Sequence, residues 1–473
     1  MIVRHSLFYI VARFLPGVLG MTTTALLTRF LTPEQYGVYG FALLVMTFTA
    51  GMGFDWLGIS FMRFYEARQN DPAFLATILR LFVTTIVLLS IPTALVWVFG
   101  GVLGTSPAIF TLGIVMAVFY AWFELAARYE VANFRPMQYL KMNVGRAAVA
   151  MAGCVTAAAV THNPMWTACG LLLGTAAGAM LGDRAWSKVN WRAVDPKLTS
   201  QILAFGLPYA ASLTLAAFVN SGTRAMVQGF GSLEALGYFT AAFLLIQNTL
   251  VIIATGLGSA TYPVAVRAVE SGNRREAEAQ LRRNGALVLA VMAPAALGMA
   301  LTGPSLAATL VGPAFAEPVA QLTPWMTLAA FLSTVRANYL DHAFQLGHRP
   351  FRQVWVSGAA ALVVMGTGFY LIPAEGPLGA AKAMTLGMAA AFVLGLVLMR
   401  RAYPMPLPIA EGARVLAACL VMALAVRMLP GVGPWWLAGQ VTIGCASYAL
   451  AGLGLNLLAS RDALWAWTRR LAL

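Results

Sequence analysis

One stretch near the start of the chain, Phe30-Leu31-Thr32-Pro33-Glu34-Gln35-Tyr36-Gly37-Val38-Tyr39, recurs 200 residues later as Phe230-Gly231-Ser232-Leu233-Glu234-Ala235-Leu236-Gly237-Tyr238-Phe239. The two copies keep Phe, Thr or Ser, Glu, Gly, and Tyr or Phe at the same positions. Each copy leads from one apolar stretch of sequence into the next. This recurrence predicts an internal repeat, a common feature of membrane transporter folds.

Three further matches extend the repeat to both sides. The offsets of all four rise steadily along the chain, from 192 to 200, 202 and 214, as small insertions would make them. The added pairs are Leu15-Pro16 with Leu207-Pro208, Pro92 with Pro294, and Arg135-Pro136 with Arg349-Pro350. Together they predict two six-helix halves, residues 1–199 and 200–402, followed by an extra transmembrane hairpin and cytoplasmic tail over 403–473. Because six is an even number, the two halves share one orientation, and a pseudo-two-fold axis along the membrane normal relates them.

The composition places most of the chain inside a lipid bilayer. Of 473 residues, 60% are apolar and only 10% are charged, and the mean hydropathy is +0.76. A soluble domain carries about 25% charged residues, so this chain could not cover a water-exposed surface. At about 20 residues per crossing, the sequence predicts an all-α integral membrane protein with about fourteen spans. The apolar windows are 7–28, 38–58, 78–99, 108–127, 144–161, 165–182, 201–221, 236–257, 285–303, 321–340, 354–372, 378–399, 414–429 and 436–458.

The net charge of +14 follows from the placement of the basic residues. Loops rich in Lys and Arg alternate with loops that carry almost no charge, and 25 of the 31 basic residues lie on one side. Basic loops face the cytoplasm. The pattern therefore predicts a multi-pass protein of the bacterial inner membrane with both termini in the cytoplasm, and it accounts for the charge without a nucleic-acid partner.

A few cations lie inside or just beyond the predicted spans. A charged side chain costs about 2.5–3.5 kcal/mol or more at the bilayer centre unless it faces a partner or water. Guanidinium groups can bind a phosphate through two hydrogen bonds, so these residues are candidate substrate-binding cations of a cavity. For the three nearer the outer interface, snorkelling of the side chain is an equal alternative. The five are Arg13 and Arg336, which lie deeper, and Arg29, Arg224 and Lys382.

Three acids lie near the same spans: Asp55 in span 2, Glu124 in span 4 and Asp341 at the foot of span 10. They could pair with Arg13 or Arg336, or one could take up H+ or Na+ to drive a transport cycle. A purely structural ion pair is the favoured reading for Asp341.

Interruptions at matching places in the two halves point to a transport pathway. Pro16 with Gly17 in span 1, and Pro208 in span 7, are expected to kink their helices because proline removes a backbone hydrogen bond. A simpler reading is that proline is common in membrane helices.

A second glycine pattern and several absent motifs complete the reading. Gly170, Gly174, Gly178 and Gly182 repeat every fourth residue in span 6, which predicts close packing inside the first half, with dimerisation as the second choice. No lysine follows a glycine, so there is no P-loop, and the histidines form no HExxH motif. Cys154, Cys169, Cys419 and Cys445 lack the spacing of a zinc or redox site. We therefore expect no catalytic residue, no metal and no enzymatic activity.

The segment from Arg29 to Tyr39 resembles the signature of the polysaccharide transport family, the Wzx-type O-antigen and exopolysaccharide flippases. Phe205-Gly206-Leu207-Pro208 and Phe134-Arg135-Pro136 with Tyr139 are similar to other recurrent features of that family. The resemblance covers the whole chain in span number, in its two halves and in the trailing pair. It extends to the wider multidrug/oligosaccharidyl-lipid/polysaccharide exporter superfamily.

This resemblance implies a V-shaped fold of two six-helix bundles and a flippase activity. Such proteins move an undecaprenyl-diphosphate-linked oligosaccharide from the cytoplasmic to the periplasmic leaflet by alternating access, for O-antigen, capsule or exopolysaccharide synthesis. It further implies cavity arginines, for which Arg13, Arg29 and Arg224 are the candidates here. Expected partners are the lipid-linked oligosaccharide, membrane lipids, and polysaccharide polymerases or glycosyltransferases, with no cofactor other than a coupling ion.

Two alternatives stay open from the sequence. One is an ion-coupled exporter of small molecules of the multidrug type, against which the two trailing spans argue mildly. The other is a membrane polymerase or assembly component for polysaccharide, which would need a large outward loop that the sequence lacks.

Overall fold

The computed structural model describes residues 2–100, 106–182, 186, 189–191, 193–270, 273–347, 349, 351–403, 405–459 and 461. Over these residues the regular secondary structure is helical, without a strand. The chain forms two compact units, Met1–Thr240 and Ala241–Leu473. The boundary falls later than the predicted repeat boundary after residue 199 because the next helix packs on helices of the first unit. The division into repeats at 199 and 402 stays a prediction.

The first unit contains helices α1 to α9 and the first two turns of α10. Their bounds are α1 Ile2–Phe30, α2 Pro33–Gly53, α3 Asp55–Arg68, α4 Pro72–Phe99, α5 Pro107–Ala132, α6 Pro136–Thr161, α7 Pro164–Met180, α8 Pro196–Ala217, the π-helix η2 Phe218–Gly222, α9 Thr223–Phe230 and α10 Leu233–Glu270. Helix α8 packs against α2 and α3.

The second unit contains the rest of α10 and the helices that follow it. They are α11 Arg274–Leu301, α12 Gly303–Leu310, α13 Pro313–Val335, the π-helix η3 Arg336–Leu340, α14 His342–Leu346, α15 Phe351–Glu375, α16 Pro377–Ala402, α17 Ile409–Arg427 and α18 Pro434–Gly454. Here α15 packs on α16, α11 packs on α13 and α17, and α17 packs on α18.

The expected all-α membrane fold is confirmed. Each of the fourteen predicted windows lies mainly on a different long helix. Among the described residues, ten helices are long and apolar enough to cross a membrane: α2, α4, α5, α6, α10, α11, α15, α16, α17 and α18. The other four windows fall on α1, α7, α8 and α13. The protein is therefore a multi-pass membrane protein.

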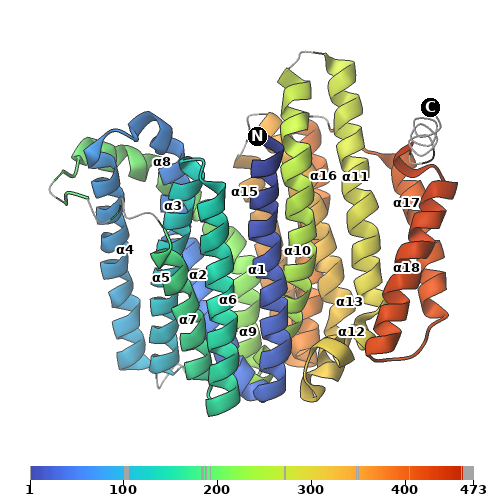
Figure 1. Cartoon of the computed structure of the whole chain (residues 1–473), viewed down its shortest axis with the longest axis horizontal. Helices are drawn as coiled ribbons and strands as arrows, with labels where there is room; N and C mark the ends of the chain where they lie inside the picture. The colour runs from blue at the N-terminus through green and yellow to red at the C-terminus, as the bar shows by residue number, and fades with distance from the viewer. Residues whose placement is uncertain are drawn as a thin grey trace. The chain divides into compact units, whose positions relative to one another are not determined.

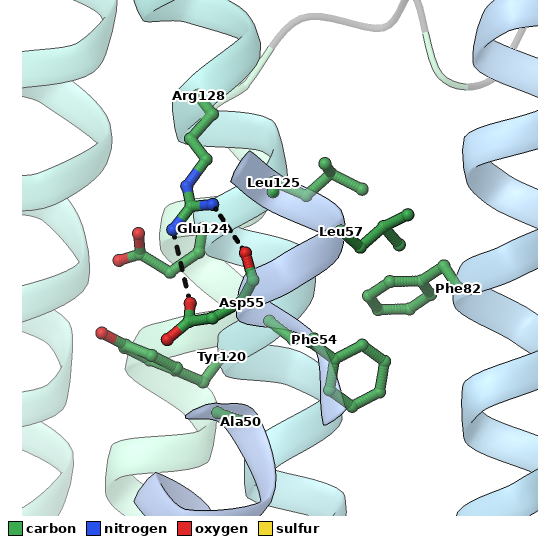
Figure 2. A pocket seen from close by; sticks show the side chains of 11 residues that line it. Ala50, Phe54, Asp55, Leu57, Phe82, Tyr120, Glu124, Leu125 and Arg128 are labelled. Carbon is green, nitrogen blue, oxygen red and sulfur yellow. Dashed lines mark hydrogen bonds and ion pairs between the residues drawn. The ribbon is translucent and has the colours of Figure 1, made fainter. Parts of the chain in front are cut away.

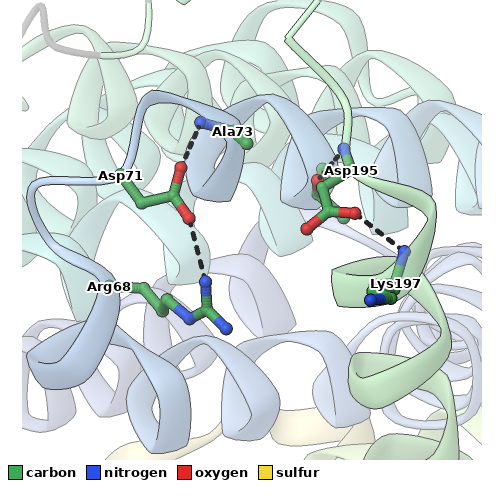
Figure 3. Close-up of polar contacts among 6 residues, drawn as sticks. Arg68, Asp71, Ala73, Asp195 and Lys197 are labelled. Carbon is green, nitrogen blue, oxygen red and sulfur yellow. Dashed lines mark hydrogen bonds and ion pairs between the residues drawn. The ribbon is translucent and has the colours of Figure 1, made fainter.

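Proline and a short polar side chain define where many helices begin. Six helices of the first unit have proline as their first residue, where its missing N–H is not needed and its fixed φ suits the helix. Asp71 accepts a hydrogen bond from the Ala73 N–H at 2.9 Å and pairs with Arg68 at 3.2 Å (Figure 3). Asp195 caps α8 by accepting from the Lys197 N–H at 2.8 Å (Figure 3). Such caps satisfy donors that the first helical turn leaves open.

The glycine face of α7 packs inside the first unit, as predicted. Helices α6 and α7 lie side by side (Figure 1). A Cβ added to Gly170 would overlap the backbone of Cys154, and one added to Gly174 would lie 2.5 Å from the Ala150 nitrogen. The small residues thus let two backbones approach closely.

We expect Gly174→Ala to destabilise the protein. The added methyl group meets rigid backbone, and such overpacking costs about 1–3 kcal/mol. Thermal unfolding in detergent measures the effect. The matched control is Gly366→Ala in α15, where an added Cβ meets nothing within 4 Å. An equal melting temperature for both variants would contradict the packing assignment.

Candidate functional site

A charged cluster lies inside the first unit where α2 ends and α3 begins. Phe54, with φ −126° and ψ −27°, interrupts the helical run and makes Asp55 the first residue of α3. Asp55 Oδ1 lies 3.3 Å from Nη2 of Arg128 in α5, and Arg128 Nη1 donates to the Asp55 carbonyl at 3.3 Å (Figure 2). The guanidinium therefore holds both the carboxylate and the backbone at the helix junction.

A second acid and a phenol complete this cluster. Glu124 and Tyr120 precede Arg128 by one and two turns of α5 and line the same small pocket as Asp55 (Figure 2). Apolar side chains, among them Phe54 and Phe82, form the other wall. The pocket thus combines two acids, one cation and one hydroxyl in an apolar setting.

Gly58 makes room for the Arg128 guanidinium. A Cβ at position 58 would overlap Nη1 of Arg128. A glycine one turn into α3 is therefore required for the ion pair to form in this geometry.

Asp55 pairs with Arg128, a partner that the sequence analysis did not consider beside Arg13 and Arg336. Helix α5 continues to Ala132, so that Arg128 lies in the helix one turn after Glu124. The i, i+4 spacing of these two residues was the available signal.

Helix α5 contains another buried acid, Glu130, which the sequence pattern did not indicate. Glu130 is fully buried, and its carboxylate lies 3.8 Å from Arg135, whose side chain is half exposed. The Arg135 N–H donates to the Glu130 carbonyl at 3.0 Å, so this pair fastens the turn between α5 and α6.

In the second unit, Asp341 pairs with Arg336, one of the two partners proposed for it. Arg336 Nη1 lies 3.4 Å from Asp341 Oδ2, and the two side chains are only 15% and 3% exposed. Gln353 of α15 donates to the same Oδ2 at 3.4 Å. Among the described residues, Asp341 Oδ1 and the Nε and Nη1 atoms of Arg336 have no hydrogen-bond partner.

The remaining predicted cations lie in different settings. Arg224 in α9 is 3% exposed and donates to Thr47 Oγ1 of α2 at 3.2 Å. Lys382 in α16 pairs with Glu375 and lies 5.6 Å from the centre of the Trp325 ring. Arg29 is exposed at the end of α1. The side chain of Arg13 lies outside the described part of the structure.

Helical irregularity occurs elsewhere than at the predicted hinge prolines. Helix α1 continues through Pro16 and Gly17, and α8 continues through Pro208, whose side chain lies outside the described part. Their role as hinges stays a prediction. Among the described residues, the structure shows two π-helices, η2 and η3, a rare conformation that often marks functional sites.

An arginine with low exposure lies at each π-helix. Arg336 is the first residue of η3, and Arg224 follows η2 by two residues. Side chains bond the nearby carbonyls: Arg224 Nε donates to Asn220 at 3.3 Å, and Asn338 Nδ2 donates to Thr334 at 2.9 Å. Among the described residues, no group of three or more His, Cys, Asp or Glu side chains is placed to hold a metal ion.

Because Gly58 and Arg128 are in contact, substitutions at these two positions should not have additive effects on stability. Gly58→Ala in a helix gains about 0.5–1 kcal/mol from helix propensity. In the native chain the new methyl group also displaces Arg128, so the gain should be smaller there than in an Arg128→Ala background. A double-mutant cycle on thermal unfolding should give about 1 kcal/mol. A value of zero would contradict the contact.

Breaking the Arg336–Asp341 pair should cost far more than breaking an exposed one. Asp341→Leu leaves a buried guanidinium without its acid, a loss of about 3–5 kcal/mol, whereas Arg336→Met together with Asp341→Leu should recover most of it. As a control, Glu278→Gln removes the exposed pair with Arg274 at 2.9 Å and should cost less than about 1 kcal/mol. Equal losses in the single and double variants, measured by thermal unfolding, would count against this assignment.

Comparison with solved structures identifies the fold. A lipid II flippase, MurJ, in the inward closed conformation superposes with a TM-score of 0.79 at 14% identity, covering 97% of this chain and 99% of the flippase. An inward-facing multidrug resistance MATE transporter of the MOP superfamily gives 0.63 at 15% identity, covering 83% and 97%. A MOP superfamily transporter from Pyrococcus furiosus gives 0.58 at 12% identity, covering 85% and 94%.

Comparison at the level of sequence identifies the family. None of the curated proteins compared matches the chain. The sequence profile of a family described as "Polysaccharide biosynthesis protein" matches residues 26–320, which is more than half of the chain and includes both copies of the repeated stretch. The chain therefore belongs to this polysaccharide biosynthesis protein family.

Proposed function

We propose that the protein is a flippase for undecaprenyl-diphosphate-linked oligosaccharide repeat units, which it moves from the cytoplasmic to the periplasmic leaflet by alternating access. The observation that carries the proposal is the combination of family and fold. The family is one of polysaccharide biosynthesis, and the fold matches a lipid II flippase over 97% of the chain. The translocated unit would serve O-antigen, capsule or exopolysaccharide synthesis.

An apolar cavity of the second unit supports a lipid-linked substrate. It has a volume of about 470 Å³ and lies among α11, α13 and α17. Its wall includes Leu289, Leu297, Phe331, Val415 and Leu416. Leu416 is also 63% exposed on the outer surface of the unit. A space of this kind suits an isoprenoid chain, because the apolar surface of the chain is then covered by apolar side chains.

The buried arginine of the first unit supports an anionic head group. Arg224 is 3% exposed, and a guanidinium is the side chain best suited to bind a diphosphate through paired hydrogen bonds. Arg336 and Lys382, which pair with carboxylates, belong to the same proposed set. Arg13 and Arg29 complete the proposed set.

The acids of the first unit are our candidates for coupling transport to an ion gradient. Asp55 and Glu124 share one pocket, and Asp55 is 40% exposed at its side chain. An H+ or Na+ bound there would compete with Arg128 for the Asp55 carboxylate. Asp341 is a weaker candidate, because Arg336 and Gln353 both contact it.

We take the two trailing helices as support for this proposal over a multidrug exporter. The match to the lipid II flippase covers 97% of the chain, whereas the match to the MATE transporter covers 83%. Helix α17 of the hairpin also forms one wall of the apolar cavity. We place the protein in the bacterial inner membrane with both termini in the cytoplasm, in accordance with its basic loops.

A deletion strain tests the proposal directly. Loss of the protein should cause single lipid-linked repeat units to accumulate on the cytoplasmic leaflet, because later steps use them on the other side. Accumulation on the periplasmic leaflet would instead indicate a polymerase. Normal surface polysaccharide with altered drug susceptibility would indicate a multidrug exporter.

The same strain tests Arg224. Arg224→Ala should lose most polysaccharide export at an unchanged membrane level, since the head group then lacks its cation, and Arg224→Lys should retain part of it. The matched control is Arg427→Ala, which removes an exposed arginine at the end of α17 and should export normally. Full export by Arg224→Ala would remove this residue from the binding site.

A further inference from the structure

The starts of α2 and α10 pack together through two glycines. Each glycine approaches the backbone of the other helix at the equivalent position. A Cβ added to Gly37 would overlap the carbonyl oxygen of Leu233. One added to Gly237 would overlap the carbonyl oxygen of Pro33. Because residues 33 and 37 become 233 and 237 after a shift of 200, the contact is its own image under the sequence repeat. All four residues belong to the first compact unit.

Gly40 and Thr240 mark the centre of this symmetric contact. A Cβ added to Gly40 would lie 2.7 Å from Oγ1 of Thr240, its own repeat partner. Only residues next to a two-fold axis can meet their own images. The burial pattern agrees, since each position from 32 to 40 has the same burial class as its partner from 232 to 240. We call Gly37, Gly40, Gly237 and Thr240 the glycine seam.

The seam has features of a contact that can separate. Its closest approaches run through glycines, so no interlocking side chains hold these points together. Thr240 is fully buried, and its hydroxyl has no hydrogen-bond partner. A buried polar group without a partner is unfavourable, and water would satisfy this hydroxyl as soon as the seam opened. Burial of this hydroxyl therefore opposes closure of the seam.

The seam lies at the predicted outer end of the membrane. It follows the two segments that join spans 1 to 2 and 7 to 8, on the side of the chain with few basic residues. We propose that the glycine seam is the outer closure of the substrate route, and that it parts and re-forms in each transport cycle. This inference rests on the proposed transport function, and it names the backbone contact at which the two repeats separate.

Cysteine labelling tests whether the seam opens. Thr240→Cys should react with a membrane-impermeant maleimide added from outside to cells that export polysaccharide, and labelling should fall several-fold when substrate synthesis is blocked. Thr175→Cys, equally buried at 2% exposure in α7, should stay unlabelled. The wild-type chain, with its four cysteines, gives the background. Absence of Thr240→Cys labelling during normal export, or labelling only from the cytoplasmic side, would overturn the proposal.

Glycine substitution tests how the seam closes. Gly37→Ala should leave the seam open and raise outside labelling of Thr240→Cys several-fold. Gly40→Ala, which meets only the Thr240 side chain, is the milder variant if Gly37→Ala fails to insert. Gly229→Ala is the control because an added Cβ there meets nothing within 4 Å. Unchanged labelling in a well-inserted Gly37→Ala or Gly40→Ala protein would overturn the role of the glycines.

The labelling result is separable from the identity of the substrate. If the deletion strain shows that another molecule is transported, labelling of Thr240→Cys that depends on that molecule still supports the seam. If the oligosaccharide is confirmed and Thr240→Cys never reacts, the seam alone is rejected.

Discussion

A charged side chain inside an apolar helix bundle has to be satisfied by the protein, because the surrounding lipid offers it nothing. Much of the local geometry of this chain follows from that constraint. Arg128 reaches Asp55 only because position 58 is a glycine. Arg336 reaches Asp341, five residues further on, where the chain adopts a π-helix and the Asp341 N–H bonds to the Arg336 carbonyl at 2.9 Å. Arg224 finds Thr47 just after the other π-helix. The α-helices are interrupted near these cations, by a helix break in one case and by a π-helix in the other two.

One pair of positions that match in the predicted repeat has different neighbouring side chains in the structure. Gly58 and Gly258 are 200 residues apart, as are the two copies of the repeated stretch. Gly58 makes room for Arg128, and a Cβ on Gly258 would overlap Oδ1 of Asn338. The glycine is thus retained in both halves while its neighbour is a cation in one and an amide in the other. The first half keeps the charges at this junction, and the second half places its ion pair beside it, at Arg336 and Asp341.

The features that could be predicted from the sequence are those that depend on pattern. Apolar windows located the long helices, and the four-residue spacing of Gly170 to Gly182 predicted close packing inside the first half, because period and residue size decide both. The partner of Asp55 could not be predicted, since it depends on how far α5 extends before its helix ends. The π-helices could not be predicted either, because one extra residue in a helical turn does not change the hydropathy pattern. The prolines indicated interruptions at other positions. The burial of Glu130 could not be predicted for the same reason, because it lies in the last turn of α5.

The wall that α17 contributes to the apolar cavity has a consequence for biogenesis. Ribosomal synthesis proceeds from the N-terminus, so α11 and α13 enter the membrane before Val415, Leu416 and Cys419 of α17 are made. Until then the cavity lacks the wall that α17 supplies. The cavity therefore gains its final lining only after α17 has been inserted.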